Sequence, residues 1–250
     1  MIEIPPRDPL TQPQGVEEGY AHTRMRWPAE PLQKRPHTVS ELSGPLLSPH
    51  ALARRIAPVR GGTQDPSGSK RTDPSRGDLA GHGERRAIGQ LIHLRTRIVD
   101  EDGTPVPGTV VELWHCNAAG KYIHPNDQST SPADPNFYGA ARLVADENGL
   151  IELRTIKPAA YAVPDTGGWW RPPHVHISVW GRVWLSRLVT QMFFPGEPLN
   201  EYDYILNAVR DPQARSRGIA RLAPTGGGPA DALVFEHEIV VRGRKAAPSL

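Results

Sequence analysis

The sequence predicts an all-β protein: an antiparallel β-sandwich that follows an extended N-terminal arm rich in proline and glycine. Three observations support this class. Short runs rich in Val, Ile, Leu and aromatic residues recur from about residue 87 onward. Gly, Asp, Asn and Pro turns separate these runs, and helical periodicity is nearly absent. A chain of 250 residues has room for one large all-β domain or two small ones.

The first third of the chain has the composition of an arm. Residues 1–85 contain 12 prolines and 9 glycines but only two aromatic residues, Tyr20 and Trp27. Such a segment lacks the apolar side chains that would offset the entropy lost on ordering an independent core. We therefore expect residues 1–86 to form an arm and loop that wraps a partner chain, which predicts an oligomer.

The strands begin after the arm. The first, residues 91–99, alternates imperfectly between apolar and polar residues and ends at the turn 100–103. The second, residues 106–114, places Val111 and Leu113 on one face and their neighbours on the other. Both runs fit strands that lie in a sandwich.

Five further runs complete the predicted sandwich. A turn at residues 146–149 separates the third strand from the fourth, and a Pro-Pro pair fixes the entry to the fifth. The best helical candidate lies at about residues 200–210. We expect the sandwich to span residues 87–244 and residues 245–250 to form a tail. The five strands are expected at residues 139–144, 150–156, 174–180, 188–194 and 233–241.

Charge and cysteine content exclude several function classes. Lys and Arg number 29 against 27 Asp and Glu, and no dense basic tract could follow a phosphate backbone, so we expect no nucleic-acid partner. No apolar run has the length of a membrane span and no secretory signal is visible, so we expect no membrane partner. The single cysteine, Cys116, cannot build a disulfide framework, and the expected compartment is the cytoplasm.

The sharpest local signal for chemistry is the pair His174 and His176. Residues i and i+2 of a strand point to the same face, so both imidazoles can converge on one metal ion. Imidazole suits Zn, Cu, Fe and Ni, and the pair alone does not choose among them. Arg171 places a permanent cation nearby, which favours anionic ligands or an anionic substrate. The alternative is two half-exposed histidines with ordinary hydrogen bonds.

Carboxylates do not supply obvious anionic donors for such a site. Glu152 and Asp165 lie closest to this strand in sequence, and neither has a ligand spacing. Tyrosines could take this role, because Tyr122 and Tyr161 each follow a strand and a phenol ionises when it binds a trivalent metal. The alternative for each is a half-buried tyrosine whose hydroxyl is hydrogen-bonded.

Eight short segments, in order along residues 87–244, carry a resemblance to a known family. They are residues 98–107, 112–114, 117–122, 126–127, 134–137, 154–158, 170–176 and 190–192. In this order they resemble the intradiol ring-cleavage dioxygenases, and the match extends more weakly into the arm at residues 19–20 and 38–45. So many segments in one order are far more specific than the histidine pair alone.

The resemblance implies a mononuclear non-haem Fe(III) as cofactor, with Tyr122, Tyr161, His174 and His176 as its ligands. It also implies that Tyr161 accepts a proton from the substrate, so that this residue is both ligand and catalytic base. Arg171 matches the family's active-site arginine, whose cation would stabilise negative charge on the substrate ring.

The resemblance further implies which residues surround the substrate. Gln191 matches the residue that orients the active-site arginine and is the third catalytic position. Val163 stands where related chains usually carry a tryptophan, so this pocket wall could admit a different catechol. The implied substrate-binding positions are Tyr20, Trp114, Val163 and Ile205.

The implied reaction is the O2-dependent cleavage of a catechol between its two hydroxyl-bearing carbons, a step of the β-ketoadipate pathway of aromatic catabolism. Protocatechuate, which would give 3-carboxy-cis,cis-muconate, is the first expectation, and catechol and hydroxyquinol are the alternatives. The implied assembly is a hetero-oligomer with a homologous alpha chain, or a homo-oligomer.

Two other hypotheses fit parts of the sequence. The turn 100–103 and the strand-like residues 105–113 also resemble transthyretin-like binding or structural modules that have no catalytic activity. A zinc hydrolase could use the histidine pair, but no third ligand is spaced to complete a zinc site. The two tyrosines, the two histidines and Arg171 together favour the dioxygenase.

Overall fold

The computed structural model describes residues 77–82, 85–124, 127–164, 166–180, 187–224 and 232–241. All seven expected strands are present in this part of the chain, which confirms the all-β class. They are β3 (Leu91–Val99), β4 (Val110–Trp114), β5 (Ala140–Val144), β6 (Leu150–Ile156), β9 (His174–Trp180), β10 (Arg187–Phe193) and β12 (Leu233–Val240).

Shorter elements connect these strands. The two-residue strands are β1 (Gly81–His82), β2 (Arg85–Arg86), β7 (Tyr161–Ala162), β8 (Trp170–Arg171) and β11 (Arg221–Leu222). The helical candidate at 200–210 is confirmed as the 3-10 helix η4 (Pro198–Tyr202) and the α-helix α3 (Tyr204–Asn207). The helix α4 (Pro212–Arg217) was not expected, because six residues are too few to show an apolar period.

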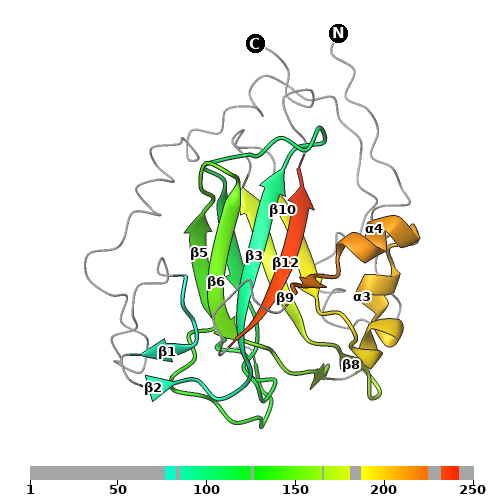
Figure 1. The fold of residues 1–250 in the computed structure, drawn as a ribbon. Helices are drawn as coiled ribbons and strands as arrows, with labels where there is room; N and C mark the ends of the chain where they lie inside the picture. Colours follow the sequence, from blue (N-terminus) through cyan, green and yellow to red (C-terminus); the bar gives the residue numbers. More distant parts are fainter. Residues whose placement is uncertain are drawn as a thin grey trace, which may run out of the picture.

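Two four-stranded sheets pack face to face (Figure 1). The strand orders are β10-β9-β4-β5 and β11-β12-β3-β6. Pairing within these two sheets is antiparallel, as predicted, except that β12 runs parallel to β3. The parallel pair arises because the last strand returns to lie beside the first long strand, and both arrows point the same way in Figure 1.

The strand β4 begins at Val110 and not at residue 106 as expected. Pro107 has no backbone N–H to offer a neighbouring strand, and Gly108 has a φ of +72°, which forms a turn. The Thr109 hydroxyl closes this turn by donating to the carbonyl of Val106 at 2.8 Å. Residues 106–109 therefore form a turn, and the strand begins only at Val110.

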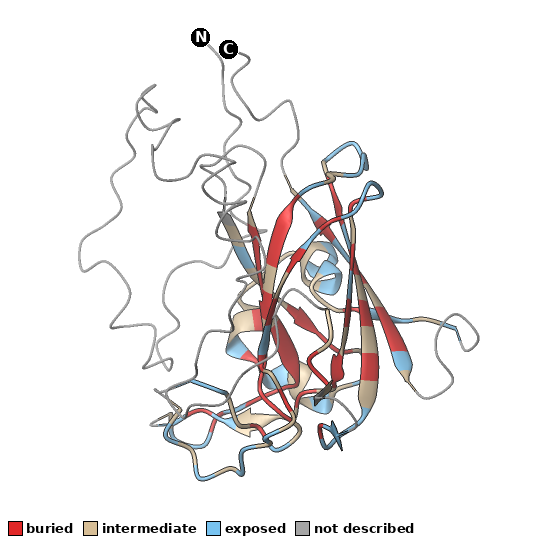
Figure 2. Ribbon diagram, turned by 90° about the vertical axis from the view of Figure 1, so that its left-hand side faces the viewer, coloured by how far each residue is buried: buried red, intermediate tan, exposed pale blue. Residues whose placement is uncertain are grey.

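The hydrophobic core lies between the two sheets (Figure 2). In β3 the inward side chains Ile92, Leu94 and Ile98 are buried, while His93 and Arg95 on the other face are half-buried. This alternation is the period of two that the sequence shows. Burial of these aliphatic side chains is the main stabilising term of such a sandwich.

Strand β9 is covered on both faces, since none of its residues is exposed. It lies inside its sheet, between β10 and β4. Val175, Ile177 and Val179 belong to the core between the sheets. Since side chains alternate along a strand, His174 and His176 lie on the opposite face, where they contact Tyr122, Arg171 and Trp114. This face positions the functional site.

Most of the expected arm, residues 1–76, lies outside the described residues, as does the tail 245–250. The arm as a partner-wrapping segment therefore stays a prediction. Leu79 and Ala80, at its described end, are buried in the core of the sandwich. Within the described ranges no helix combines the length and the apolar character needed to cross a membrane.

Candidate metal centre and active site

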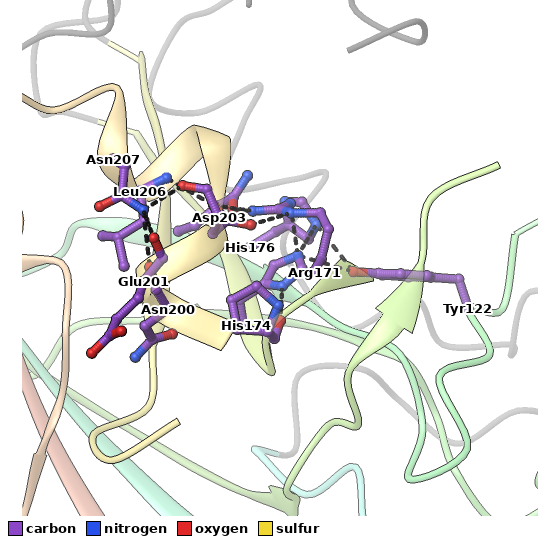
Figure 3. Close-up of polar contacts among 11 residues, drawn as sticks. Tyr122, Arg171, His174, His176, Asn200, Glu201, Asp203, Leu206 and Asn207 are labelled. Carbon is purple, nitrogen blue, oxygen red and sulfur yellow. Dashed lines mark hydrogen bonds and ion pairs between the residues drawn. The ribbon is translucent and has the colours of Figure 1, made fainter. Parts of the chain in front are cut away.

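Strand β9 presents two imidazoles to one point. The Nε2 atoms of His174 and His176 are 3.3 Å apart. The hydroxyl oxygen of Tyr122 approaches the same point and lies 3.4 Å from His174 Nε2 and 3.1 Å from His176 Nε2 (Figure 3). Three donor atoms from two separate segments of the chain thus converge.

The protonation of His174 follows from its surroundings. Its Nδ1 lies 2.7 Å from the carbonyl oxygen of Pro172, which can only accept a hydrogen bond, so Nδ1 carries the hydrogen. Its Nε2 therefore presents a lone pair to the convergence point. Burial, assisted by the cation of Arg171, lowers the pKa of His174 well below 6.5. The ring is neutral at pH 7, as a metal ligand must be.

His176 is prepared in a similar way. Burial, with a further contribution from Arg171, lowers the pKa of His176 to about 3. Trp114, its register partner on β4, stacks on the imidazole with 5.0 Å between ring centroids and 3° between planes. The flat contact fixes the plane of the ring, and Nε2 is the nitrogen that faces the centre.

Tyr122 is held by the loop that follows β4. Its backbone N–H donates to Asp127 Oδ2 at 2.7 Å. Lys121 Nζ donates to Asp127 Oδ1 at 3.2 Å and to the carbonyl of Ser129 at 2.6 Å, which closes the loop. Burial, with the neighbouring Tyr161, raises the pKa of Tyr122 well above 10. A cation at the centre would displace this proton, so metal uptake should be stronger at higher pH.

Tyr161 lies beside the centre on the short pair β7–β8, in which it is opposite Arg171. Its ring stands perpendicular to the ring of Tyr122 with 5.4 Å between centroids. The centroid of the Tyr161 ring also lies 5.6 Å from the centroid of the His174 ring. The structure thus brings the four side chains predicted as ligands into one cluster, although the chain separates the two tyrosines by two strands.

Arg171 is fully buried beside this cluster. Its Nη1 donates to His174 Nε2 at 3.0 Å, and its Nη2 donates to Gln191 Oε1 at 2.6 Å. Its Nε donates to Asp203 Oδ2 at 2.9 Å, and its guanidinium carbon lies 5.7 Å from the ring centroid of Trp169. A permanent cation therefore faces the donor atoms from a fixed position.

Comparisons with known proteins agree with this geometry. The family model described as Dioxygenase matches residues 64–243. The protocatechuate 3,4-dioxygenase beta chain of Burkholderia cepacia is 39% identical over 233 residues, which cover 90% of this chain and 96% of that one. The chain belongs to the intradiol ring-cleavage dioxygenase family. A non-catalytic module is thereby excluded, and this intradiol dioxygenase is an enzyme.

Further relatives of the dioxygenase extend the same picture. The chlorocatechol 1,2-dioxygenase of Rhodococcus opacus is 31% identical over 128 residues, 46% of this chain and 48% of that one. The crystal structure of 3-chlorocatechol 1,2-dioxygenase from Rhodococcus opacus 1CP shares the fold, with a TM-score of 0.52, 22% identity and 77% of each chain covered. That structure supports the β-sandwich and nothing finer.

The donor set of this dioxygenase fits a ferric ion. The three donor atoms are 3.1–3.4 Å apart, as expected of ligands that each lie about 2 Å from one centre. Among the described residues, no group of three or more His, Cys, Asp or Glu side chains is placed to hold a metal. A metal bound between the two Nε2 atoms would also have the Tyr122 oxygen within reach, and phenolates are hard donors that suit a highly charged ion. This weighs against a zinc hydrolase.

The other predicted pocket residues are less directly placed. Val163 follows β7, is buried, and donates its backbone N–H to the carbonyl of Trp169 at 2.9 Å. Ile205 is half-buried on α3. Tyr20 lies outside the described residues. Their role as substrate-binding residues remains a prediction.

Asp203 was not predicted as a site residue from the sequence. It is fully buried and pairs with Arg171, but it lies 27 residues after the end of the His174–His176 pair, so the sequence does not show that the two sites are close in space. The sequence carries one feature that marks Asp203: an Asp directly before an apolar helical turn such as Tyr204–Asn207 is a typical N-cap. That signal predicts the cap and not the ion pair.

Gly120 lets the two tyrosine segments pack closely. Its φ is +80°, and a Cβ atom there would lie 3.1 Å from Tyr161 Cβ and 3.2 Å from the carbonyl oxygen of Ala160. We expect Gly120→Ala to lower the free energy of unfolding by about 2–3 kcal/mol, through backbone strain and crowding. Iron content should also fall, because relief of the clash displaces Tyr161.

Gly103→Ala is the matched control for this change. Gly103 has a similar φ of +78°, but a Cβ atom at this position would have no neighbouring atom within 4 Å. It should therefore show the backbone cost of about 1 kcal/mol alone and leave iron content unchanged. Urea unfolding and iron analysis of both variants check the prediction, and equal losses in the two variants would contradict it.

Proposed function

We propose that the chain cleaves protocatechuate with O2 to 3-carboxy-cis,cis-muconate, at a non-haem Fe(III) held by Tyr122, Tyr161, His174 and His176. The observation that carries this proposal is the convergence of the Tyr122 oxygen and both Nε2 atoms, with Tyr161 packed against them. When bound, the ferric ion supplies Lewis acidity that makes a chelated catechol reactive toward O2.

Residues of the chain would accept a substrate proton, stabilise negative charge and orient the groups of the site. A catechol must lose two protons to bind through both oxygens, and the Tyr161 oxygen can accept one of them. If the His174 Nε2 lone pair binds the metal, Arg171 Nη1 would lose this acceptor and could donate instead to negative charge that develops on the ring. Gln191 holds the guanidinium through Nη2, and Trp114 keeps His176 in place. Burial of the cluster strengthens each of these charge interactions.

The choice of protocatechuate rests on relatedness. The Burkholderia cepacia protein named for this substrate matches nearly the whole chain, whereas the chlorocatechol and catechol dioxygenases match about half of it. Catechol and hydroxyquinol remain the alternatives, and Val163 is where the pocket could differ. Residues 87–244 would form the catalytic sandwich.

The proposal includes a partner and a compartment. The name beta chain of the Burkholderia cepacia relative suggests a hetero-oligomer with a homologous alpha chain, and a homo-oligomer is the alternative. The arm of residues 1–86 would wrap that partner, except at its end, where Leu79 and Ala80 are buried in the sandwich of this chain. The cytoplasm is the proposed compartment, supported by a buried free thiol at Cys116, the only cysteine.

Oxygen consumption with three substrates tests the proposal. The iron-loaded protein is assayed, alone and with any co-purifying chain, on protocatechuate, catechol and hydroxyquinol, and the products are identified. We expect the highest kcat/KM for protocatechuate, with 3-carboxy-cis,cis-muconate as product. A higher value for catechol or hydroxyquinol would reassign the substrate, and failure with all three would overturn the dioxygenase proposal.

A further inference from the structure

We propose that Asp203 is a positioning residue that sets the orientation of Arg171 toward the substrate. This inference rests on the proposed function, because it concerns how the cation is presented to a bound catechol. The ion pair joins two side chains that are 1% and 0% exposed, so solvent cannot take the place of either partner.

Asp203 and Gln191 together occupy two of the three guanidinium nitrogens, Nε and Nη2. Asp203 Oδ2 accepts from Nε at 2.9 Å and Asp203 Oδ1 accepts from Nη2 at 3.3 Å. Gln191 Oε1 accepts from Nη2 at 2.6 Å. These contacts leave Nη1 to point at the donor cluster, where it donates to His174 Nε2 at 3.0 Å. The two hydrogen bonds from Nε and Nη2 to the carboxylate thus determine that Nη1 is the nitrogen that faces the substrate.

Contacts with the ring faces alone would not fix this orientation. The guanidinium carbon lies 5.7 Å from the ring centroid of Trp169 and 6.0 Å from that of Phe193. Such contacts hold a planar cation by its faces and permit it to turn within its own plane. Hydrogen bonds from Asp203 and Gln191 remove that freedom, and Asp203 also supplies the negative charge that a buried cation requires.

Asp203 is itself rigidly held. Its Oδ1 accepts from the backbone N–H of Leu206 at 2.8 Å, so the same carboxylate caps α3. Its carbonyl oxygen accepts from the backbone N–H and the side-chain amide of Asn207, at 3.0 and 2.8 Å. Figure 3 shows Asp203 between this helical turn and Arg171, with Tyr122 on the far side of the cation. The first turn of α3, which carries Ile205, is thereby tied to the active-site arginine.

The test replaces the carboxylate without removing the cap. Asp203→Asn keeps the size of the side chain and an acceptor oxygen for the N–H of Leu206. It weakens the hydrogen bond from Arg171 Nε and removes the negative charge that faces the buried cation. Asp211→Asn is the matched control, because Asp211 caps α4 through the N–H of Gln213 at 2.9 Å, in a hydrogen bond that is exposed to solvent. Both variants are loaded with iron and assayed on the substrate that the wild-type chain prefers.

We expect Asp203→Asn to retain its iron and to lose about 100-fold in kcat, with a much smaller change in KM. The visible band of the iron–substrate complex, recorded without O2, should also differ from the wild-type band, because the charge beside the ring has moved. Asp211→Asn should match the wild type in iron content, kcat, KM and the visible band. A kcat for Asp203→Asn within about threefold of wild type would overturn the assignment.

A second comparison separates positioning from mere structural support. If Asp203 acts only through Arg171, then Arg171→Gln and the double variant Arg171→Gln/Asp203→Asn should have the same kcat. A further loss of about tenfold in the double variant would overturn the proposal. If Asp203→Asn does not fold, the double variant, which buries neither charge of the pair, is compared with Arg171→Gln once circular dichroism shows that Arg171→Gln tolerates the buried Asp203 carboxylate. A wild-type chain inactive on every catechol would instead overturn the proposed function, and this inference with it.

Discussion

Replacing His174 with alanine should abolish both iron binding and ring cleavage. His174 is fully buried, its Nδ1 is fixed by the carbonyl of Pro172, and its Nε2 lies within 3.4 Å of the two other donor atoms of the centre. Even residues that only support a metal ligand change metal affinity by about 10–100-fold when they are lost, so loss of a ligand should exceed about 100-fold. Iron analysis and oxygen consumption measure both effects.

His93→Ala is the matched control for His174→Ala. His93 is a half-buried histidine on β3, in the other sheet. Its removal should leave iron content and kcat close to wild type. Retention of iron and of activity in His174→Ala would show that the metal centre lies elsewhere.

Tyr161→Phe should lower kcat/KM by about 100-fold or more, because the phenol oxygen is both a proposed ligand and the proposed acceptor of a substrate proton. The phenylalanine ring keeps the perpendicular contact with Tyr122 and the contact with His174, so the fold should be preserved. Steady-state kinetics give the size of the loss, and circular dichroism shows that the sandwich is intact.

This variant also separates the dioxygenase from a zinc hydrolase, which would not need the Tyr161 oxygen. Tyr138→Phe is the control, since Tyr138 is half-buried and packs against the hydrophobic core. We expect Tyr138→Phe to keep most of the activity. Equal kcat/KM in Tyr161→Phe and wild type would exclude Tyr161 as ligand and base.

Local patterns made most of the fold predictable. The alternation in β3 and the turns around β6 are short-range features, and both strands begin and end as expected. The pair His174 and His176 was visible for the same reason, because two positions on one strand face need no tertiary information. The late start of β4 shows the limit, since apolar character at Val106 does not overrule a proline and a glycine turn.

Long-range placement was not predictable from patterns. Nothing in the spacing of Tyr122 and Tyr161 shows that their rings meet at 5.4 Å, because that contact depends on the pair β7–β8 and on the absence of a side chain at Gly120. Only the resemblance to a family indicated it. Asp203 was missed because an ion pair between distant segments leaves no periodic trace in either one.

The visible spectrum of the iron-loaded chain tests the central claim most directly. Two tyrosinates on a ferric ion should make the protein red-brown, and protocatechuate added without O2 should shift the band as the iron ligands change. We expect both the colour and the shift, and neither in His174→Ala. A colourless, iron-free protein from iron-replete cells, or a band that protocatechuate leaves unchanged, would contradict the account.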